Sequence, residues 1–202
     1  MTTGTFRKSI ASALFSVFAL WSVSTSHGHA QTARIGAATP QHHDMKPALK
    51  NDAANLITVV RDATRRFADV SIAKAEGYAL QFGCVSGADA GAMGLHYVNS
   101  SLVGDGELDP ARPEIVIYEP MPDGRLRLIG ADYLVLAESW QAKHKEAPQI
   151  MGQLLHLFES PNRFGLPAFY TLHVWAWKDN PDGMFVNWHP KVSCEAFSGR
   201  SR

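Results

Sequence analysis

A histidine surrounded by aromatic residues is the feature of this sequence that most clearly suggests chemistry. The segment 169–177, FYTLHVWAW, is aromatic and β-branched and ends at the turn sequence KDNPDG, which is typical of a strand. Because strand side chains alternate between faces, His173 should share one face with Thr171, Trp175 and Trp177. An imidazole between indoles on a half-buried face is a common way to build a pocket. This face is therefore a candidate site.

An acid lies among leucines in a second predicted strand, residues 125–136. Simple alternation places Asp132 in the row that contains Leu126, Leu128, Gly130, Leu134 and Leu136. Burying a carboxylate is costly, so such a residue is usually paired, bound to a metal or protonated. The alternative is that Gly130 marks a β-bulge, which shifts the register and turns Asp132 outward. The sequence leaves both interpretations open.

Three further residues are candidate ligands. His96 lies in a predicted strand, 94–99, where nearby glycines would let another group approach the backbone closely. Glu119 follows a predicted strand at a loop edge, where a solvated carboxylate is the favoured interpretation. His156 lies among leucines and is either a buried partner or a fourth ligand.

These residues favour a metal site slightly over two other classes of function. Imidazole and carboxylate ligands from separate strands, His96 and His173 with Asp132 or Glu119 and with His156 as a candidate fourth ligand, suit Zn²⁺, Cu²⁺, Fe²⁺ or Mn²⁺. An open coordination position would permit hydrolytic or oxidative chemistry, so whether the protein is an enzyme stays open.

The first alternative is a non-enzymatic carrier of a small molecule. Its pocket would be lined by Trp140, Trp175, Trp177 and Tyr133, with His173 as a hydrogen-bonding group. The second is an extracytoplasmic interaction module in which the aromatic residues are simply core.

The elements that would position these side chains begin with a helix. An apolar stripe at three- and four-residue spacing predicts a helix from residue 51, and a second short helix is expected at 70–76. Strands are predicted at 78–82, 94–99, 115–118, 125–136 and 169–177, with a short helix at 139–146 and a long connection at 148–166. The fold class is therefore α+β, with an N-terminal helix or helix pair followed by a bent or barrel-like antiparallel sheet.

The N-terminal region carries a targeting pattern. Basic residues, an apolar run and small residues before Gln31 predict a signal peptide over 1–30, followed by a polar, disordered leader over 31–50 and a single domain over 51–202. We expect an exported protein of the periplasm or the extracellular space, with no stable membrane insertion after cleavage.

Cysteine content and charge agree with this expectation. Cys84 and Cys194 are the only cysteines, and an even count in an oxidising compartment predicts that they pair. The chain has 19 basic and 19 acidic residues and no basic stripe, so nucleic acid is not an expected partner. The expected partner is a metal ion or a small molecule.

Several longer blocks resemble a known protein family. They are GAMGLHYVN (91–99), LDPARPE (108–114), YEP (118–120), RLIGADY (127–133), PNRFGLPAFYTLHVWAWKDNP (161–181) and VSC (192–194). Together they resemble a family of uncharacterised bacterial secreted proteins, over most of residues 60–194. The resemblance implies export and a bacterial source, and it implies no activity.

Overall fold

The computed structural model describes residues 47–199, and their side chains from residue 52 onward. The predicted signal peptide and nearly all of the predicted leader lie outside these residues. The helical elements are α1 (Pro47–Thr64), the 3₁₀ helix η1 (Arg65–Ala68), α2 (Val70–Ala75), α3 (Ser100–Asp105) and α4 (Ala137–Gln141). The strands are β1 (Tyr78–Ser86), β2 (Ala92–Asn99), β3 (Ile115–Pro120), β4 (Leu126–Leu136), β5 (Gln149–Ile150), β6 (Gln153–Leu154), β7 (His156–Phe158) and β8 (Phe169–Val174).

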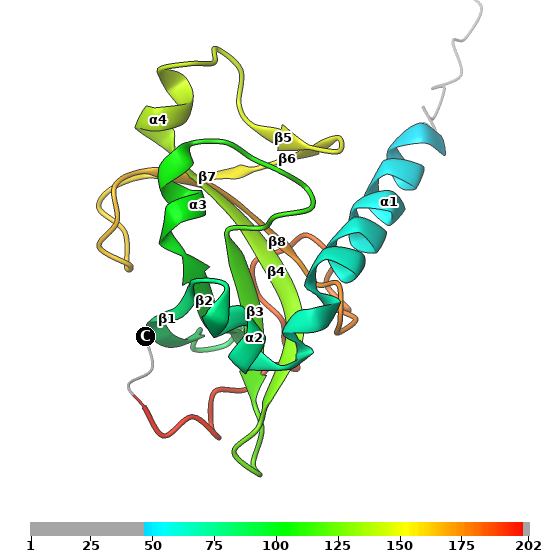
Figure 1. Ribbon diagram of the computed structural model, residues 1–202, viewed down its shortest axis with the longest axis vertical. Coiled ribbons are helices and arrows are strands. Elements are labelled where there is room, and N and C mark those ends of the chain that lie inside the picture. Colours follow the sequence, from blue (N-terminus) through cyan, green and yellow to red (C-terminus); the bar gives the residue numbers. More distant parts are fainter. Residues whose placement is uncertain (1–46, 200–202) are drawn as a thin grey trace, which may run out of the picture. The chain divides into compact units, whose positions relative to one another are not determined.

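The main sheet has six antiparallel strands in the order β1-β2-β3-β4-β8-β7 (Figure 1). Strands β1 and β7 are its two edges, so the sheet is open and does not close into a barrel. Strands β5 and β6 form a separate two-stranded hairpin. The predicted α+β class with an antiparallel sheet is confirmed.

Helix α1 covers part of one face of the sheet. Its apolar stripe buries Leu56 and Val60 completely, and they pack in one core cluster with Tyr133 of β4 and Leu172 of β8. The stripe therefore has the role that its spacing predicts, although the helix begins at Pro47 rather than at residue 51. Burying each such side chain contributes about 1.5–3 kcal/mol.

The opposite face carries another core cluster. Ile115 and Ile117 of β3 pack there with Leu134 of β4 and with Phe169 and Trp175. The covering comes from the segment between β7 and β8 and from the C-terminal segment, which supply these partly or fully buried side chains: Phe158, Phe164, Leu166, Val192 and Cys194. Both faces of the central strands are therefore buried.

Cys84 and Cys194 form a disulfide across 110 residues of sequence, as predicted. The bond ties β1 to the C-terminal segment, and it indicates an oxidising environment. None of the helices in the described part of the chain has the length and apolar character needed to cross a membrane.

Three predicted elements differ from the structure, and helix α3 was not predicted. The strand expected at 169–177 is β8, which ends at Val174. The helix expected at 139–146 is α4, which ends at Gln141. The connection expected at 148–166 contains three short strands, β5, β6 and β7. Strands of two or three residues are too short for alternation to be visible in the sequence.

Candidate functional site

Strand pairing places three polar side chains on the face opposite α1. Asp132 of β4 pairs directly with His173 of β8, and His96 of β2 pairs with Ile117 of β3, which in turn pairs with Gly130 of β4. Directly paired residues of antiparallel strands project to the same face. His96, Asp132 and His173 therefore converge from β2, β4 and β8, although 77 residues separate the two histidines in sequence.

A β-bulge in β4 decides where Asp132 points. Ile117 pairs with Gly130 whereas its neighbour Tyr118 pairs with Leu128, so Ile129 is the additional residue of the bulge. Leu128 consequently packs in the cluster around Tyr118, on the face away from Asp132. The expectation that Leu126, Leu128 and Asp132 share one face was wrong.

The bulge does not expose Asp132, however. Because the second face is also covered, Asp132 is only 2 % exposed, and the predicted outward turn of this side chain is wrong as well. Both interpretations of β4 were therefore partly correct. The bulge is present and reverses the alternation of faces, and the residues that follow it on one face, Asp132 and Leu134, are buried in the site.

Glycines let the strands approach closely beside His96. Gly94 has φ +92°, and a Cβ placed on it would lie 2.6 Å from the Tyr118 carbonyl oxygen. Gly91, with φ +76°, is likewise in contact with the backbone of His189. The close approach expected of these glycines is therefore present, and only glycine fits both the backbone angle and the space at these positions.

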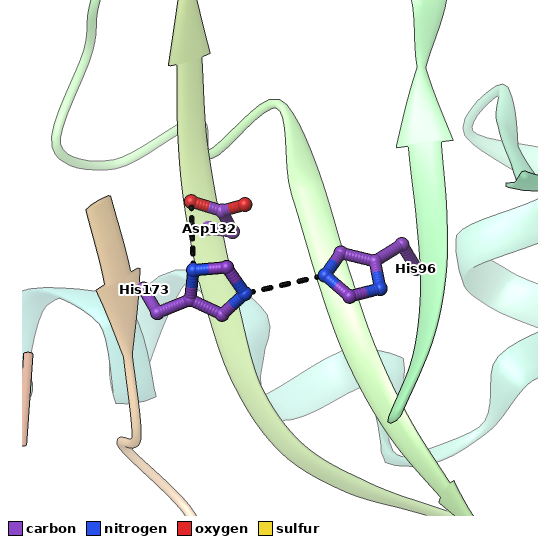
Figure 2. Close-up of side chains that lie close together, drawn as sticks. All are labelled: His96, Asp132 and His173. Atoms are coloured by element: carbon purple, nitrogen blue, oxygen red, sulfur yellow. Dashed lines mark hydrogen bonds and ion pairs between the residues drawn. The ribbon is translucent and has the colours of Figure 1, made fainter. Parts of the chain in front are cut away.

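The two imidazoles face each other through their Nε2 atoms. These atoms are 3.2 Å apart, and the His173 ring lies between the His96 ring and the Asp132 carboxylate (Figure 2). Asp132 Oδ1 is 3.7 Å from His173 Nδ1, which is too long for a hydrogen bond. One ligand atom from each of the three residues lies within 4.8 Å of the others, so this buried group can hold a metal ion.

The Asp132 carboxylate is held in place by β8. Its Oδ1 accepts hydrogen bonds from Thr171 Oγ1 at 2.5 Å and from the Leu172 backbone N–H at 3.1 Å. Neither donor is charged, and within the described residues Asp132 forms no ion pair with a lysine or an arginine. A buried carboxylate without a cationic partner is unusual.

Burial sets the protonation of all three groups. Desolvation lowers the pKa of His96 to about 4 and that of His173 to about 3. It raises the pKa of Asp132 to about 6, against the opposing effects of His96 and the two hydrogen bonds. Both imidazoles are therefore neutral at pH 7, which leaves a nitrogen lone pair on each ring for a ligand.

Each ring also has a nitrogen without a partner. His96 Nδ1 and His173 Nδ1 are buried and make no hydrogen bond of good geometry. Two polar groups nearby, the Gly94 backbone for His96 and the Asn187 side chain for His173, oppose the lowering of the pKa by burial, but they are too poorly placed to satisfy either ring. Buried polar atoms of this kind are rare in folded proteins, and each one calls for an explanation such as a bound ion or water. The imidazoles are thus incompletely satisfied by protein groups alone.

A small cavity of about 30 Å³ adjoins the three residues. Apart from them and Thr171, its lining is apolar and includes Phe82, Met93, Ile115, Leu134, Phe164 and Phe169. A much larger groove of about 1010 Å³ runs elsewhere, along Lys74, Tyr97 and Arg125, and none of the three polar residues lines it. The titratable side chains converge at the small cavity, so we place the candidate site there.

The other two predicted ligands lie outside this group. Glu119 lies within β3 and is only 6 % exposed, so its interpretation as a solvated carboxylate was wrong. It accepts hydrogen bonds from Lys178 Nζ at 2.7 and 2.8 Å and also pairs with Arg127. Burial raises its pKa, but these two cations more than offset that effect and hold it below the usual value. His156 pairs with Thr171 in the sheet register, but it lies on the short edge strand β7, where its side chain is exposed.

The four aromatic residues predicted to line a carrier pocket are not gathered around one cavity. Trp175 is near the site, with its ring 6.0 Å from that of His173. Tyr133 packs on the α1 side, Trp140 of α4 stacks on His144, and Trp177 donates to Thr64 Oγ1 at the end of α1. Tyr133 follows Asp132 in β4 and so lies on the opposite face, and Trp140 lies on a helix. Strand β8 ends at Val174, so alternation does not extend to Trp177.

Sequence reasoning missed the apolar wall of the site. Phe158 and Phe164 come from the connection that showed no periodicity, and Phe82 comes from a bulge in β1. The density of phenylalanines between 158 and 169 was the only available signal. Thr171 was placed on the correct face, but its hydrogen bond to Asp132 was not anticipated.

Comparison of the chain with protein-family models, with curated proteins and with solved structures gives no match. The functional argument therefore rests on the geometry of the site.

Proposed function

We propose that this protein binds one divalent transition-metal ion between the Nε2 atoms of His96 and His173. Asp132, which lies on the Nδ1 side of the His173 ring (Figure 2), either orients that ring or moves to become a third ligand. The observation that carries the proposal is the 3.2 Å separation of the two Nε2 atoms. Two nitrogens bound at 2.0–2.1 Å to one tetrahedral ion are roughly 3.3–3.4 Å apart. The imidazoles thus have nearly the spacing of a ligand pair, and a hydrogen bond between them would account for the same spacing in the metal-free protein.

Charge supports the same proposal. The site combines two neutral imidazoles with one carboxylate that has no lysine or arginine partner, whereas the nearby Glu119 has both. A divalent cation would compensate the buried carboxylate and accept the lone pairs of both rings. The donor set suits Zn²⁺, Cu²⁺, Fe²⁺ or Mn²⁺, and it leaves coordination positions that the protein does not fill.

The proposed setting is the periplasm or the extracellular space. The disulfide indicates an oxidising environment, and the N-terminal sequence has the pattern of a signal peptide. We therefore infer an exported metal-binding protein, with the ion, or a small molecule that reaches it, as its partner.

Metal titration of untagged protein tests the proposal. We expect the metal-depleted protein to bind one Co²⁺ or Zn²⁺ per chain at micromolar concentration, with the absorption spectrum of Co²⁺ reporting nitrogen and oxygen ligands. His96→Ala and His173→Ala should each abolish this binding, because each removes one ligand of the pair.

Exposed histidines provide the matched controls. His144→Ala removes a side chain that stacks on Trp140 in α4 and should leave the stoichiometry unchanged. His156→Ala should do so as well unless this exposed residue, whose charge acts on His173, is the fourth ligand. A wild-type protein that binds no transition metal at micromolar concentration would contradict the proposal. Equal loss of binding in His144→Ala would place the metal elsewhere.

A further inference from the structure

The cavity beside the candidate metal centre is small and almost entirely apolar. Its volume is about 30 Å³. A cavity needs about 10–15 Å³ of such volume to hold one water, so this one accommodates about two waters or one diatomic molecule. Anything larger would have to displace the surrounding phenylalanine rings.

Apart from the Nδ1 atoms of the two imidazoles, the wall offers no free hydrogen-bond donor for such a molecule. The polar side chains that line the cavity are the three residues of the proposed site and Thr171, whose hydroxyl donates to Asp132 Oδ1. The remaining lining residues are apolar. A water needs two to four polar partners, and an anion needs more, so the wall favours a neutral, weakly solvated molecule.

We propose that this cavity admits one neutral diatomic molecule of the dioxygen or nitric oxide class, which binds at an open position of the metal. This inference rests on the proposed metal centre and adds the class of ligand that the centre takes. With two or three protein ligands the proposed ion keeps an open position, and the cavity provides space for a molecule of that size and polarity.

We place the entrance to the cavity at two phenylalanines. Phe82 and Phe164 both line it, are both half-buried, and contact each other with ring centroids 5.4 Å apart. Phe82 lies in a bulge where β1 leaves its pairing with β2 between Gln81 and Cys84, and it has φ +64°. This backbone angle is unfavourable for a phenylalanine. A strained, half-buried ring in the wall is the side chain that we expect to cover the entrance.

Nitric oxide binding to anaerobic, Fe²⁺-loaded protein tests the proposal. The expected result is one nitric oxide per iron, seen as a new visible absorption and as the half-integer-spin EPR signal of a mononuclear iron–nitrosyl. If the protein binds neither Fe²⁺ nor Co²⁺, the proposed metal centre itself fails. If it binds Co²⁺ but no Fe²⁺, the metal centre stands and this inference is overturned. If it binds iron but no nitric oxide at saturating concentration, the metal centre stands and this inference is overturned.

Two leucines on the same face of β4 form a matched pair of variants. Leu134 lines the cavity and Leu136 does not. Leu134→Phe should fill the space and weaken nitric oxide binding by about tenfold or more, whereas Leu136→Phe, with the same added volume, should not. Unchanged binding in an iron-loaded Leu134→Phe protein would show that the ligand does not occupy this cavity.

A glycine variant tests the route even if the leucine variant fails to fold. Phe82→Gly removes the covering ring and suits the positive φ, so it should fold and take up nitric oxide faster than wild type. Met151→Gly is the control, because Met151 is the other non-glycine residue with positive φ in the described chain and does not line the cavity. Equal rates in wild type and Phe82→Gly would overturn the route.

Discussion

At the scale of single residues, strand alternation identified the polar side chains of the site, but it assigned one of them, Asp132, to a face with the wrong neighbours. His173 and Thr171 share the face that their spacing predicts, and Asp132 was recognised as an acid among apolar residues. The phase of Asp132 relative to Leu128 was wrong, because a bulge adds one residue and inverts the alternation beyond it. Such a bulge is set by contacts with neighbouring strands, so the local sequence does not determine it.

Asp132→Asn measures the role of the carboxylate in the proposed site. The amide has nearly the same shape but no charge, so it can still accept hydrogen bonds from Thr171 and Leu172. If the carboxylate only orients the His173 ring, metal affinity should fall about 10–100-fold, and a larger loss would identify Asp132 as a direct ligand. Competition with a chromophoric chelator measures the affinity, and an unchanged value would exclude Asp132 from the site.

At the scale of elements, the central strands could be predicted and the covering segments could not. Strands β1 to β4 and β8 carry apolar, β-branched or aromatic residues that dominate their local sequence. The residues after β8 are held by long-range contacts such as the Cys84–Cys194 disulfide and the Lys178–Glu119 ion pair, and β7 is held by its pairing with β8. These contacts leave no periodic pattern, which is why the phenylalanine wall was missed.

Substitution of Gly94 tests how closely strands β2 and β3 approach each other. Gly94→Ala adds a Cβ at φ +92°, 2.6 Å from the Tyr118 carbonyl oxygen. The backbone angle alone should cost about 1–3 kcal/mol of unfolding free energy, and the contact should add to that cost. The strand shift that relieves it would also move His96, so metal affinity should fall too.

Gly124 is the matched control for this substitution. It has φ +80°, but a Cβ placed on it meets nothing within 4 Å. Gly124→Ala should therefore show the cost of the backbone angle alone, and the difference between the two variants in urea unfolding isolates the contact. An equal loss of stability in both would mean that β2 and β3 are not in such close contact at Gly94.

At the scale of the whole molecule, covering both faces of the sheet is what makes the site. Helix α1 covers one face, as its apolar stripe predicts, and the irregular segments cover the other. The α+β class followed from the order of the elements, whereas burial of the second face did not. That burial desolvates the His–Asp–His group, keeps its imidazoles neutral and leaves its cavity apolar.

Glu114, a buried carboxyl group that is not one of the proposed ligands, should make the free energy of unfolding depend on pH. Glu114 is 2 % exposed, and burial raises its pKa to about 8, although its Oε2 accepts a hydrogen bond from the Leu134 N–H. In the unfolded chain this carboxyl loses its proton near pH 4.5, so between pH 4.5 and 8 folding takes up a proton. The Glu114 contribution to stability therefore falls as the pH rises through this range.

A narrower window isolates Glu114 from the site histidines. The pKa values of His96 and His173 are depressed by burial, so their contribution is complete only about one pH unit above the unfolded-state value of 6.5, where they are neutral in both states. Asp132, with its pKa raised to about 6, is also ionised in both states there. Between about pH 7.5 and 8, the unfolding free energy of the metal-free protein should therefore fall with pH at a rate of at most about 1.4 kcal/mol per pH unit, the limit for one proton. Glu114→Gln retains an acceptor for Leu134 but cannot ionise, so urea unfolding of this variant should be nearly flat over that window. The glutamine side chain cannot take up a proton on folding. If the unfolding free energy of Glu114→Gln still fell with pH as steeply as that of wild type, a group other than Glu114 would be responsible for the slope.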